Sequence, residues 1–239
     1  MTAPAFTHLA DVGSTNDWLL ERAVGQADGH WVIADRQTAG RGRRGRAWGD
    51  GAGNLMASVI VRANGAVQQL SFVAALALLE ALEAGEGQGS ETPAPRFWLK
   101  WPNDVLLDGA KVSGILLERA GNALVIGFGA NLAQHPGDTE RPATSLAAAG
   151  LAVPAPLDML ARLMPAFVRY RRLWEDEGFE AIRSRWLARA AGLGDRVTAR
   201  LGTETLEGRF DGLAADGALT LRLDDDSLRA IHAGEVFAL

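Results

Sequence analysis

The chain has 239 residues, of which 48% are hydrophobic, and it carries a formal net charge of -5. This length and composition predict a large folded domain with a well-filled core, either alone or with a small second domain. The absence of cysteine excludes disulfides, thiolate metal sites and a cysteine nucleophile. The sequence has neither a run of about 18 apolar residues nor a signal-peptide pattern, so we expect a cytoplasmic protein that does not enter a membrane.

The first half of the sequence predicts helices and short buried strands. Ser14, Thr15 and Asn16 are suited to cap the start of a helix. Short apolar runs indicate strands, and a stretch rich in alanine and leucine indicates a buried helix. The expected elements are a helix at 17–23, strands at 31–34 and 55–61, a helix at 71–84 and a surface loop at 85–96.

The second half predicts further strands and helices, and then a change of pattern. Pro165 lies inside one predicted helix, where we expect a kink or a break because proline removes a backbone donor. From Asp195, short alternating segments separated by glycine turns are typical of a small β-barrel. The expected elements are strands at 97–101, 112–119 and 124–131, helices at 157–176 and 180–190, and short strands at 196–201, 206–210, 219–223, 229–232 and 235–238.

Together these elements predict an α+β protein with two domains. Residues 1–192 would form a mixed β-sheet with helices, and residues 193–239 would form the small barrel. The four histidines are scattered without the spacing of a metal site, so the sequence names no metal ligand.

A loop rich in arginine and glycine follows the strand at 31–34. Its segment 40–46 satisfies the G-x-G-x-x-G pattern of dinucleotide-binding turns. That interpretation needs a helix to start there, but three more glycines follow by position 53, and each costs a helix about 1 kcal/mol. A P-loop is excluded because Arg46 and Ala47 replace its lysine and hydroxyl residue. The pattern therefore favours a flexible loop whose guanidinium groups bind carboxylate or phosphate oxygens and which orders around a ligand.

Only two of the 24 basic residues are lysines, Lys100 and Lys111. Lysine is a compact point charge and arginine a broad planar fork, so a narrow pocket can require lysine. Lys100 ends a predicted strand just before Pro102, and Asp104 follows. Lys111 precedes Gly114, which allows a ligand close to the strand. The pattern predicts two cations and a carboxylate at one end of the sheet, and the alternative is a hairpin turn with solvated charges.

Taken in order, these motifs resemble those of the biotin protein ligase family. The motifs are Ser-Thr-Asn at 14–16, Gln-x-x-Gly-Arg-Gly-Arg-x-Gly-Arg-x-Trp at 37–48, Lys-Trp-Pro-Asn-Asp at 100–104, Lys-x-x-Gly-Ile-Leu-x-Glu at 111–118, Gly-x-Gly-x-Asn at 127–131 and a further segment at 143–146. The resemblance implies the biotin–lipoate ligase fold, which is like that of class II aminoacyl-tRNA synthetases, with a small SH3-like barrel at the C-terminus. The chain departs from the family at 49–53 and at Met56, where the family often has Ser-Pro and Tyr.

The resemblance implies a reaction in two steps. The carboxylate of biotin attacks the α-phosphate of ATP, which gives biotinyl-adenylate and pyrophosphate, and a lysine of an acceptor protein then takes the biotinyl group. We expect Lys111 to lie between the two anions, Arg43 to hold their oxygens from the loop, and Asp104 to receive the acceptor's ammonium group. Closure of the loop would keep water away from the adenylate.

The resemblance also implies two sets of binding residues. Trp48 would stack on adenine, and without the resemblance a core tryptophan is an equal alternative. The residues implied for biotin are Ser14, Thr15, Asn16, Gln37, Gly40, Arg41, Gly42, Arg43, Lys111, Gly114, Leu116 and Gly127. The residues implied for ATP are Arg43, Arg46, Trp48, Lys100, Asn103, Lys111 and Asn131.

The expected substrates are ATP and biotin, with magnesium as an expected cofactor and a biotin carboxyl carrier protein as the acceptor. No winged helix precedes Ser14, so we expect no DNA binding, and pairing of sheets in family members makes a homodimer an option. Two alternatives remain open. A lipoate ligase shares the fold but lacks the arginine-rich loop in this form. A nonenzymatic binder of nucleic acid could use the loop, although the acidic net charge and the lack of interleaved aromatic residues argue against it.

Overall fold

The computed structural model describes residues 5–49, 51–63, 65–84, 96–137, 139–202 and 204–238. Apart from Arg96, the surface loop expected at 85–96 lies outside the described residues. None of the helices within these ranges is long and apolar enough to cross a membrane.

The larger sheet has seven strands in the order β1-β2-β3-β7-β6-β5-β4. β1 and β2 run parallel and the other neighbours run antiparallel, so the predicted mixed sheet is confirmed. The strands are β1 (Phe6–Val12), β2 (Trp31–Gln37), β3 (Leu55–Val61), β4 (Phe97–Lys100), β5 (Asp104–Leu107), β6 (Ala110–Ala120) and β7 (Ala123–Ala130).

Two of these strands, β1 and β5, are not among the elements expected from the sequence. β1 lies at the edge of the sheet, and every one of its residues is at least partly exposed, so its sequence contains no apolar run. β5 has only four residues and begins directly at Asp104, inside the segment interpreted as a turn. It pairs with both β4 and β6 through tight turns, and four residues are too few to show a strand pattern in the sequence.

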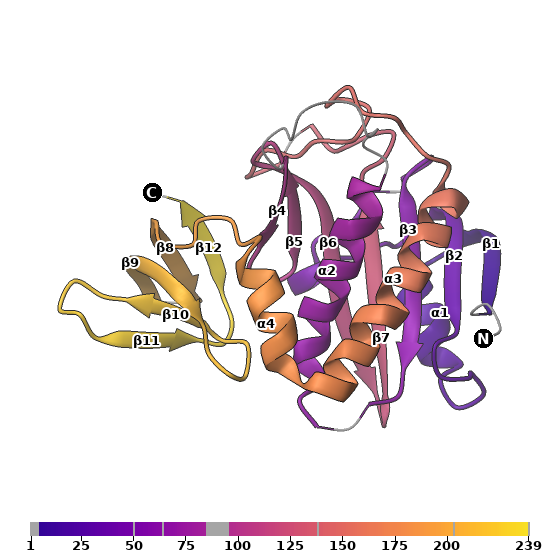
Figure 1. Ribbon diagram of the computed structural model, residues 1–239. Coiled ribbons are helices and arrows are strands. Elements are labelled where there is room, and N and C mark those ends of the chain that lie inside the picture. Colours follow the sequence, from indigo (N-terminus) through magenta and orange to yellow (C-terminus); the bar gives the residue numbers. More distant parts are fainter. Residues whose placement is uncertain are drawn as a thin grey trace.

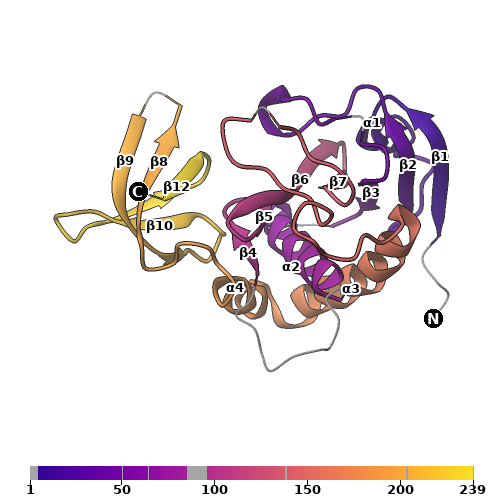
Figure 2. The same cartoon turned by 90° about the horizontal axis from the view of Figure 1, so that it is seen from above.

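Helices lie on both faces of the sheet. The helices α2 (Leu70–Glu83) and α3 (Pro156–Glu177) cover one face, and α1 (Thr15–Glu21) lies on the other (Figure 1 and Figure 2). Alternation along β2 explains the two layers: Trp31 packs in the large core with α2 and α3, and Val32 packs in a smaller cluster with α1. The remaining helical elements are α4 (Phe179–Leu187) and the 3-10 turns η1 (Arg43–Gly45) and η2 (Val67–Gln69).

A kink or a break was expected at Pro165, and the break does not occur, because α3 continues through it. Proline cannot donate to the carbonyl of Ala161, one turn earlier, but both residues lie on the exposed side of the helix, where water can satisfy that carbonyl. The opposite side, which includes Leu163 and Phe167, is buried in the core. Burial of that side therefore outweighs the local cost of proline.

The C-terminal region is a five-stranded antiparallel sheet in the order β11-β10-β9-β8-β12. The five expected strands are confirmed, but within the described residues no ladder joins β11 to β12, so the sheet is open rather than a closed barrel. The strands are β8 (Arg196–Leu201), β9 (Glu204–Leu213), β10 (Leu219–Arg222), β11 (Leu228–Ile231) and β12 (Glu235–Ala238).

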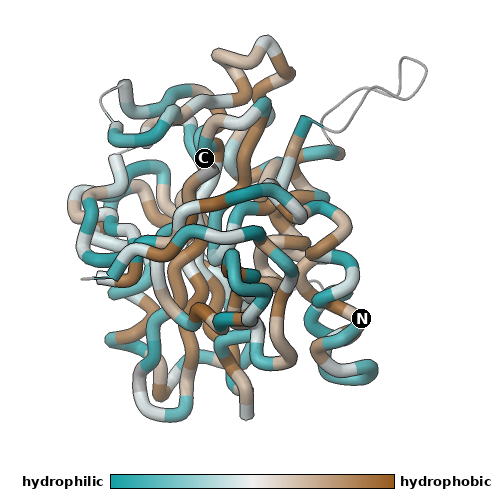
Figure 3. Tube along the Cα trace, turned by 90° about the vertical axis from the view of Figure 1, so that its left-hand side faces the viewer, coloured by the Kyte–Doolittle hydropathy of each residue, from teal (hydrophilic) through white to brown (hydrophobic). Residues whose placement is uncertain are grey.

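One apolar core joins the two sheets. Phe210 and Leu219 of the smaller sheet belong to the same buried cluster as α2 and α3. The indole of Trp101 donates to the carbonyl of Gly217 at 3.1 Å, which fixes the end of β4 against the C-terminal sheet. In Figure 3 the hydrophobic segments gather in the strands inside the fold and the hydrophilic ones on its outer turns. The C-terminal sheet is therefore placed rigidly enough to contribute to a site on its neighbour. The predicted domain boundary after residue 192 stays a prediction.

Candidate active site

A cavity of about 660 Å³ opens on the α1 side of the larger sheet. Three glycines of β6 and β7, Gly114, Gly127 and Gly129, contribute to its lining. Gly127 of β7 pairs with Ser58 of β3 and Leu116 of β6, and Gly129 pairs with Gly114 in the next row. A Cβ atom on Gly129 would lie 2.5 Å from the ring of Trp48, so only glycine leaves room for that indole. Glycine at these positions therefore leaves space for the cavity.

One end of the cavity is a buried network of neutral polar groups at the start of α1. Gln37 Oε1 accepts hydrogen bonds from the amide and the hydroxyl of Thr15, at 2.7 and 3.0 Å. Ser58 Oγ lies 2.7 Å from Thr15 Oγ1 and 2.6 Å from Asn16 Oδ1, and Asn16 Nδ2 donates to Glu118 at 2.7 Å. Such mutual bonding fixes the orientation of each group before a ligand arrives.

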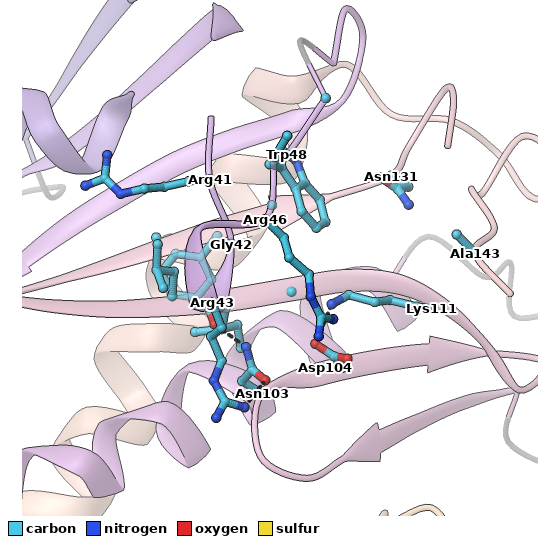
Figure 4. A pocket seen from close by; sticks show the side chains of 18 of the residues that line it. Arg41, Gly42, Arg43, Arg46, Trp48, Asn103, Asp104, Lys111, Asn131 and Ala143 are labelled. Atoms are coloured by element: carbon cyan, nitrogen blue, oxygen red, sulfur yellow. Dashed lines mark hydrogen bonds and ion pairs between the residues drawn. The ribbon is translucent and has the colours of Figure 1, made fainter. Parts of the chain in front are cut away.

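Ser14 and Arg41 support this network from its rim. Ser14 caps α1, as predicted, by accepting from the amide of Asp17. The guanidinium of Arg41 pairs with the carboxylate of Asp17 and, at 2.9 Å, with Glu118. The hydrogen bond from Arg41 lowers the pKa of Asp17, and the same pairing raises the pKa of Arg41. Figure 4 shows Arg41 directed away from Lys111 and Asp104. Its charge is therefore neutralised within this end of the cavity.

The opposite end of the cavity is cationic. Lys111 Nζ lies 2.7 Å from Asp104 Oδ1, which confirms the expected meeting of these residues at one end of the sheet (Figure 4). The backbone of Lys111 is clamped by the 142–144 segment: its amide donates to Pro142 at 2.9 Å, and its carbonyl accepts from Thr144 at 2.9 Å. A Cβ atom on Gly114 would lie 3.3 Å from Nζ, so the ammonium occupies a narrow place.

Lys100 lines the same cavity and is partly buried. Burial, followed by the positive charge of Arg141, lowers the pKa of Lys100 from 10.5 to about 8. Asp104 and Glu235 oppose this shift only in part. Loss of contact with water is thus the main reason that the charged form of Lys100 is disfavoured.

The arginines of the arginine-rich loop contact both the larger sheet's side of the cavity and the C-terminal sheet. Arg43 donates to Asn103 Oδ1 at 3.2 Å, and burial lowers its pKa. Arg46 instead forms an ion pair with Glu235 of the C-terminal sheet, and Arg44 lies 3.7 Å from the same carboxylate. Burial disfavours the charge of Glu235, but the arginines outweigh burial and its pKa lies below the usual value.

The predicted site residues come together in one place. All of those implied for biotin and ATP line the cavity except Gly40. Gly40 lies behind the wall, where a Cβ atom would be 2.9 Å from both Gln37 Nε2 and the Trp48 carbonyl, so its glycine is needed for packing. Trp48 lines the cavity within 5.9 Å of Lys111 Nζ and is not a core tryptophan. Asn131 lines it as well, anchored by donation to the Thr144 carbonyl at 3.0 Å.

Several residues of the site were not singled out from the sequence. Ser58 carried a signal, because it is the single polar residue in the apolar strand at 55–61. Asn54 accepts from three successive amides at 132–134 and shapes the loop after β7, but a polar residue before a strand is common. Arg141 and Glu235 had no local signal, since they meet only through the packing of the two sheets.

Two family models match the chain. The Biotin/lipoate A/B protein ligase family matches residues 10–131, and the Biotin protein ligase C terminal domain matches residues 192–239. The first match covers the polar network together with Lys100, Asp104 and Lys111, and the second covers the sheet that supplies Glu235. Fold and site thus define a ligase of the biotin and lipoate class.

Individual relatives narrow this class. The chain is 45% identical to the biotin--[acetyl-CoA-carboxylase] ligase of Paracoccus denitrificans, with 96% of this chain and 98% of that protein covered. It is 35% identical to the ligase of the same name from Mycobacterium tuberculosis, over 97% of this chain and 88% of that protein. The biotin protein ligase of Aquifex aeolicus in complex with biotin and ATP superimposes with a TM-score of 0.85 and 28% identity, over 98% of this chain and 99% of that one. The chain belongs to the biotin protein ligase family, and lipoate ligase is not favoured.

Proposed function

We propose that this chain activates biotin with ATP and transfers the biotinyl group to a lysine of a biotin carboxyl carrier protein. One observation carries the proposal: a single cavity joins a neutral, fully oriented polar network to a cationic end. The ureido ring of biotin needs the first, and two reacting anions need the second. The names and ligands of the relatives support the same substrates.

In the first step, an oxygen of the biotin carboxylate attacks the α-phosphorus of ATP, and the bond to the pyrophosphate oxygen breaks. Both reactants are anions, so their repulsion raises the barrier until fixed cations neutralise it. Lys111 is placed for this role because strand pairing and the 142–144 segment fix its backbone. Arg43 reaches the same space from the loop, oriented by its hydrogen bond to Asn103.

In the second step, the acceptor amine attacks the acyl carbon of biotinyl-adenylate, and AMP leaves. The attacking lysine must first lose its proton, since an ammonium group has no free electron pair. Asp104 is the carboxylate proposed to orient that ammonium, and its ion pair with Lys111 holds it at the reacting end of the cavity. Trp48, packed over Gly129, is positioned to stack on the adenine.

Magnesium enters this proposal with ATP, as part of the substrate. Among the described residues, no group of three or more His, Cys, Asp or Glu could hold a metal ion. Magnesium would neutralise phosphate charge, while the chain supplies lysine and arginine contacts. The carrier protein is a cytoplasmic partner in this proposal, which places the enzyme in the same compartment.

The proposed function is tested by transfer to a purified biotin carboxyl carrier domain. With ATP, magnesium and biotin, we expect one biotinyl group per carrier, detected as a mass increase, and none on a carrier whose acceptor lysine is changed to arginine. A parallel reaction contains lipoate in place of biotin. Transfer of lipoate alone, or no transfer of either, would contradict the proposal.

A further inference from the structure

Glu118 ends one of the sequence motifs of the site but has no role in the mechanism above. It follows Gly114 and Leu116 at alternate positions of β6, so the three residues face the same side of the sheet. Gly114 and Leu116 line the cavity, whereas Glu118 does not. The carboxylate therefore lies next to the cavity, behind residues that form its wall.

Two residues of the cavity wall, Asn16 and Arg41, donate hydrogen bonds to this carboxylate. Asn16 Nδ2 donates to Glu118 Oε2 at 2.7 Å. Arg41 donates to Oε1 from Nε at 3.2 Å and from Nη2 at 2.9 Å, and Nη2 also lies 3.2 Å from Oε2. The Glu118 side chain is 26% exposed. Each of these contacts requires an acceptor, and a carboxylate provides one at both oxygens.

The amide of Asn16 has two orientations of the same shape, in which its oxygen and its nitrogen exchange places. A carboxylate can only accept, so the nitrogen must face Glu118. That orientation turns Asn16 Oδ1 toward the hydroxyl of Ser58, at 2.6 Å. A Cβ atom on Gly127 would lie 2.4 Å from the same oxygen, so the amide also has little room to shift. Glu118 therefore selects one orientation of a group that lines the cavity.

We infer that Glu118 is a positioning residue for biotin: its carboxylate holds the Asn16 amide in the one orientation that the ligand meets. The inference rests on the proposed function, which makes biotin the ligand of the α1 end. A glutamine at position 118 has the same size, but its own N–H groups can face Asn16, so the amide is free to turn over. A turned amide exchanges the donor and the acceptor that Asn16 offers in the cavity, and a ligand matched to the first arrangement then binds more weakly.

Arg41 lies between two carboxylates, those of Glu118 and Asp17. Its guanidinium compensates the charge of Glu118, which a partly buried carboxylate needs. Asp17 contacts Arg41 with both oxygens but, within the described part of the chain, its carboxylate makes no hydrogen bond to Asn16. The two carboxylates thus share one partner and differ in the other. This difference separates a role in positioning Asn16 from a role in pairing with Arg41.

The test is biotin-dependent exchange of labelled pyrophosphate into ATP, with KM measured for each substrate. For Glu118→Gln we expect the KM for biotin to rise at least about tenfold, because a misoriented buried amide leaves donors and acceptors unpaired. The KM for ATP and the rate at saturating biotin should stay within about twofold of wild type, because the cationic end is unchanged. An unchanged KM for biotin, or an equal rise in both KM values, would overturn the inference.

Asp17→Asn is the matched control. It removes the other carboxylate beside Arg41 but leaves the bond between Glu118 and Asn16 in place. We expect a KM for biotin within about threefold of wild type, because Arg41 keeps one charged partner. A rise as large as that of Glu118→Gln would assign the effect to the charge balance of Arg41 and would also overturn the inference.

Two further variants keep the result interpretable. In an Asn16→Ala background, Glu118→Gln should raise the KM for biotin by less than about twofold, because the positioned group is gone, and a rise of about tenfold there would contradict the inference. Glu118→Asp guards against a glutamine variant that fails to fold. It keeps the charge but sets the carboxylate back by one methylene group, so the KM for biotin should rise at least about threefold. A chain whose wild type exchanges pyrophosphate with biotin, but whose KM is unchanged in Glu118→Asp, retains the proposed function and refutes the role of Glu118.

Discussion

The two ends of the cavity differ in how their polar side chains are held and in their charge. At the α1 end, Thr15, Asn16, Gln37 and Ser58 are buried and bonded to one another, and the single charge of Arg41 is matched by carboxylates. At the other end, cations outnumber carboxylates and are held by a loop and by a neighbouring sheet. The polar groups of the first end bond to one another, whereas the second end carries more positive than negative side chains.

This difference matches the chemistry of the ligands. A neutral ureido ring is recognised by fixed donors and acceptors, and any reorganisation would reduce affinity. A polyphosphate carries several negative charges and is recognised by lysine and arginine side chains. Substitutions at the α1 end should therefore weaken binding by displacing hydrogen-bonding groups. Substitutions at the cationic end should act by changing the charge or the size of a side chain.

Lys111 lies where the two ends meet, so its replacement should have the largest effect. In Lys111→Arg the charge remains, but a planar guanidinium does not fit beside Gly114 and Trp48. We expect the rate of biotin-dependent pyrophosphate exchange to fall at least about 100-fold, the size seen when one transition-state contact is removed. The control is Arg119→Lys, on the same strand but outside the cavity. Near-normal exchange by Lys111→Arg would show that charge alone suffices there.

Gly127→Ala should damage the preformed end. The added Cβ atom would lie 2.4 Å from Asn16 Oδ1, so Asn16 must move and its bonds to Ser58 and Glu118 must distort. We expect biotin to bind about 10- to 100-fold more weakly by calorimetry, since misplaced buried polar groups cost about 1–3 kcal/mol. Gly25→Ala, whose Cβ atom meets nothing closer than 3.9 Å, should bind biotin as the wild type does. Equal affinity for both variants would mean that the network does not contact biotin.

Ser58→Ala tests whether the network also stabilises the fold. The change removes the hydroxyl that lies between Thr15 and Asn16 in a fully buried position. We expect the free energy of unfolding to fall by about 1–2 kcal/mol in chemical denaturation. Ser71→Ala, on the surface of α2 with one bond to a carbonyl, should change it by less than about 0.5 kcal/mol. If the two losses are the same, the network contributes nothing to stability.

The pH dependence of pyrophosphate binding tests the cationic end and should be the smallest effect. The pKa of Lys100 is about 8, so its ammonium is present below that pH and is lost above it. Between pH 7 and 9 we expect affinity to fall by up to about fivefold, the loss of one charge contact worth about 1 kcal/mol. The control is Lys100→Arg, whose side chain stays charged over this pH range. Any change in its affinity with pH reports the ionisation of pyrophosphate itself. The same pH profile for both proteins would exclude Lys100 as the titrating group.

The sequence predicted the α1 end better than the cationic end. Thr15, Asn16 and Gln37 belong to contiguous motifs whose side chains meet through one helix start and neighbouring strands. Asp104 and Lys111 were also expected together, because a short hairpin links them. The contact between Asp104 and Lys111 is local, whereas Thr15 and Gln37 are 22 positions apart and were expected together because both belong to motifs of the family.

The contacts that escaped prediction join segments far apart in the sequence. Glu235 and Arg46 are separated by 189 positions and meet only because the C-terminal sheet packs on the larger one. β1 escaped for a related reason: as an exposed edge strand it has no apolar pattern, and its pairing with β2 defines it. Burial and long-range pairing, rather than local propensity, decide these features.

The most direct test of the account is the exchange of labelled pyrophosphate into ATP by the wild-type chain, with biotin, with lipoate and with neither. The account predicts exchange that depends on biotin and requires magnesium and ATP. Exchange with lipoate but not biotin, or no exchange with either, would contradict it.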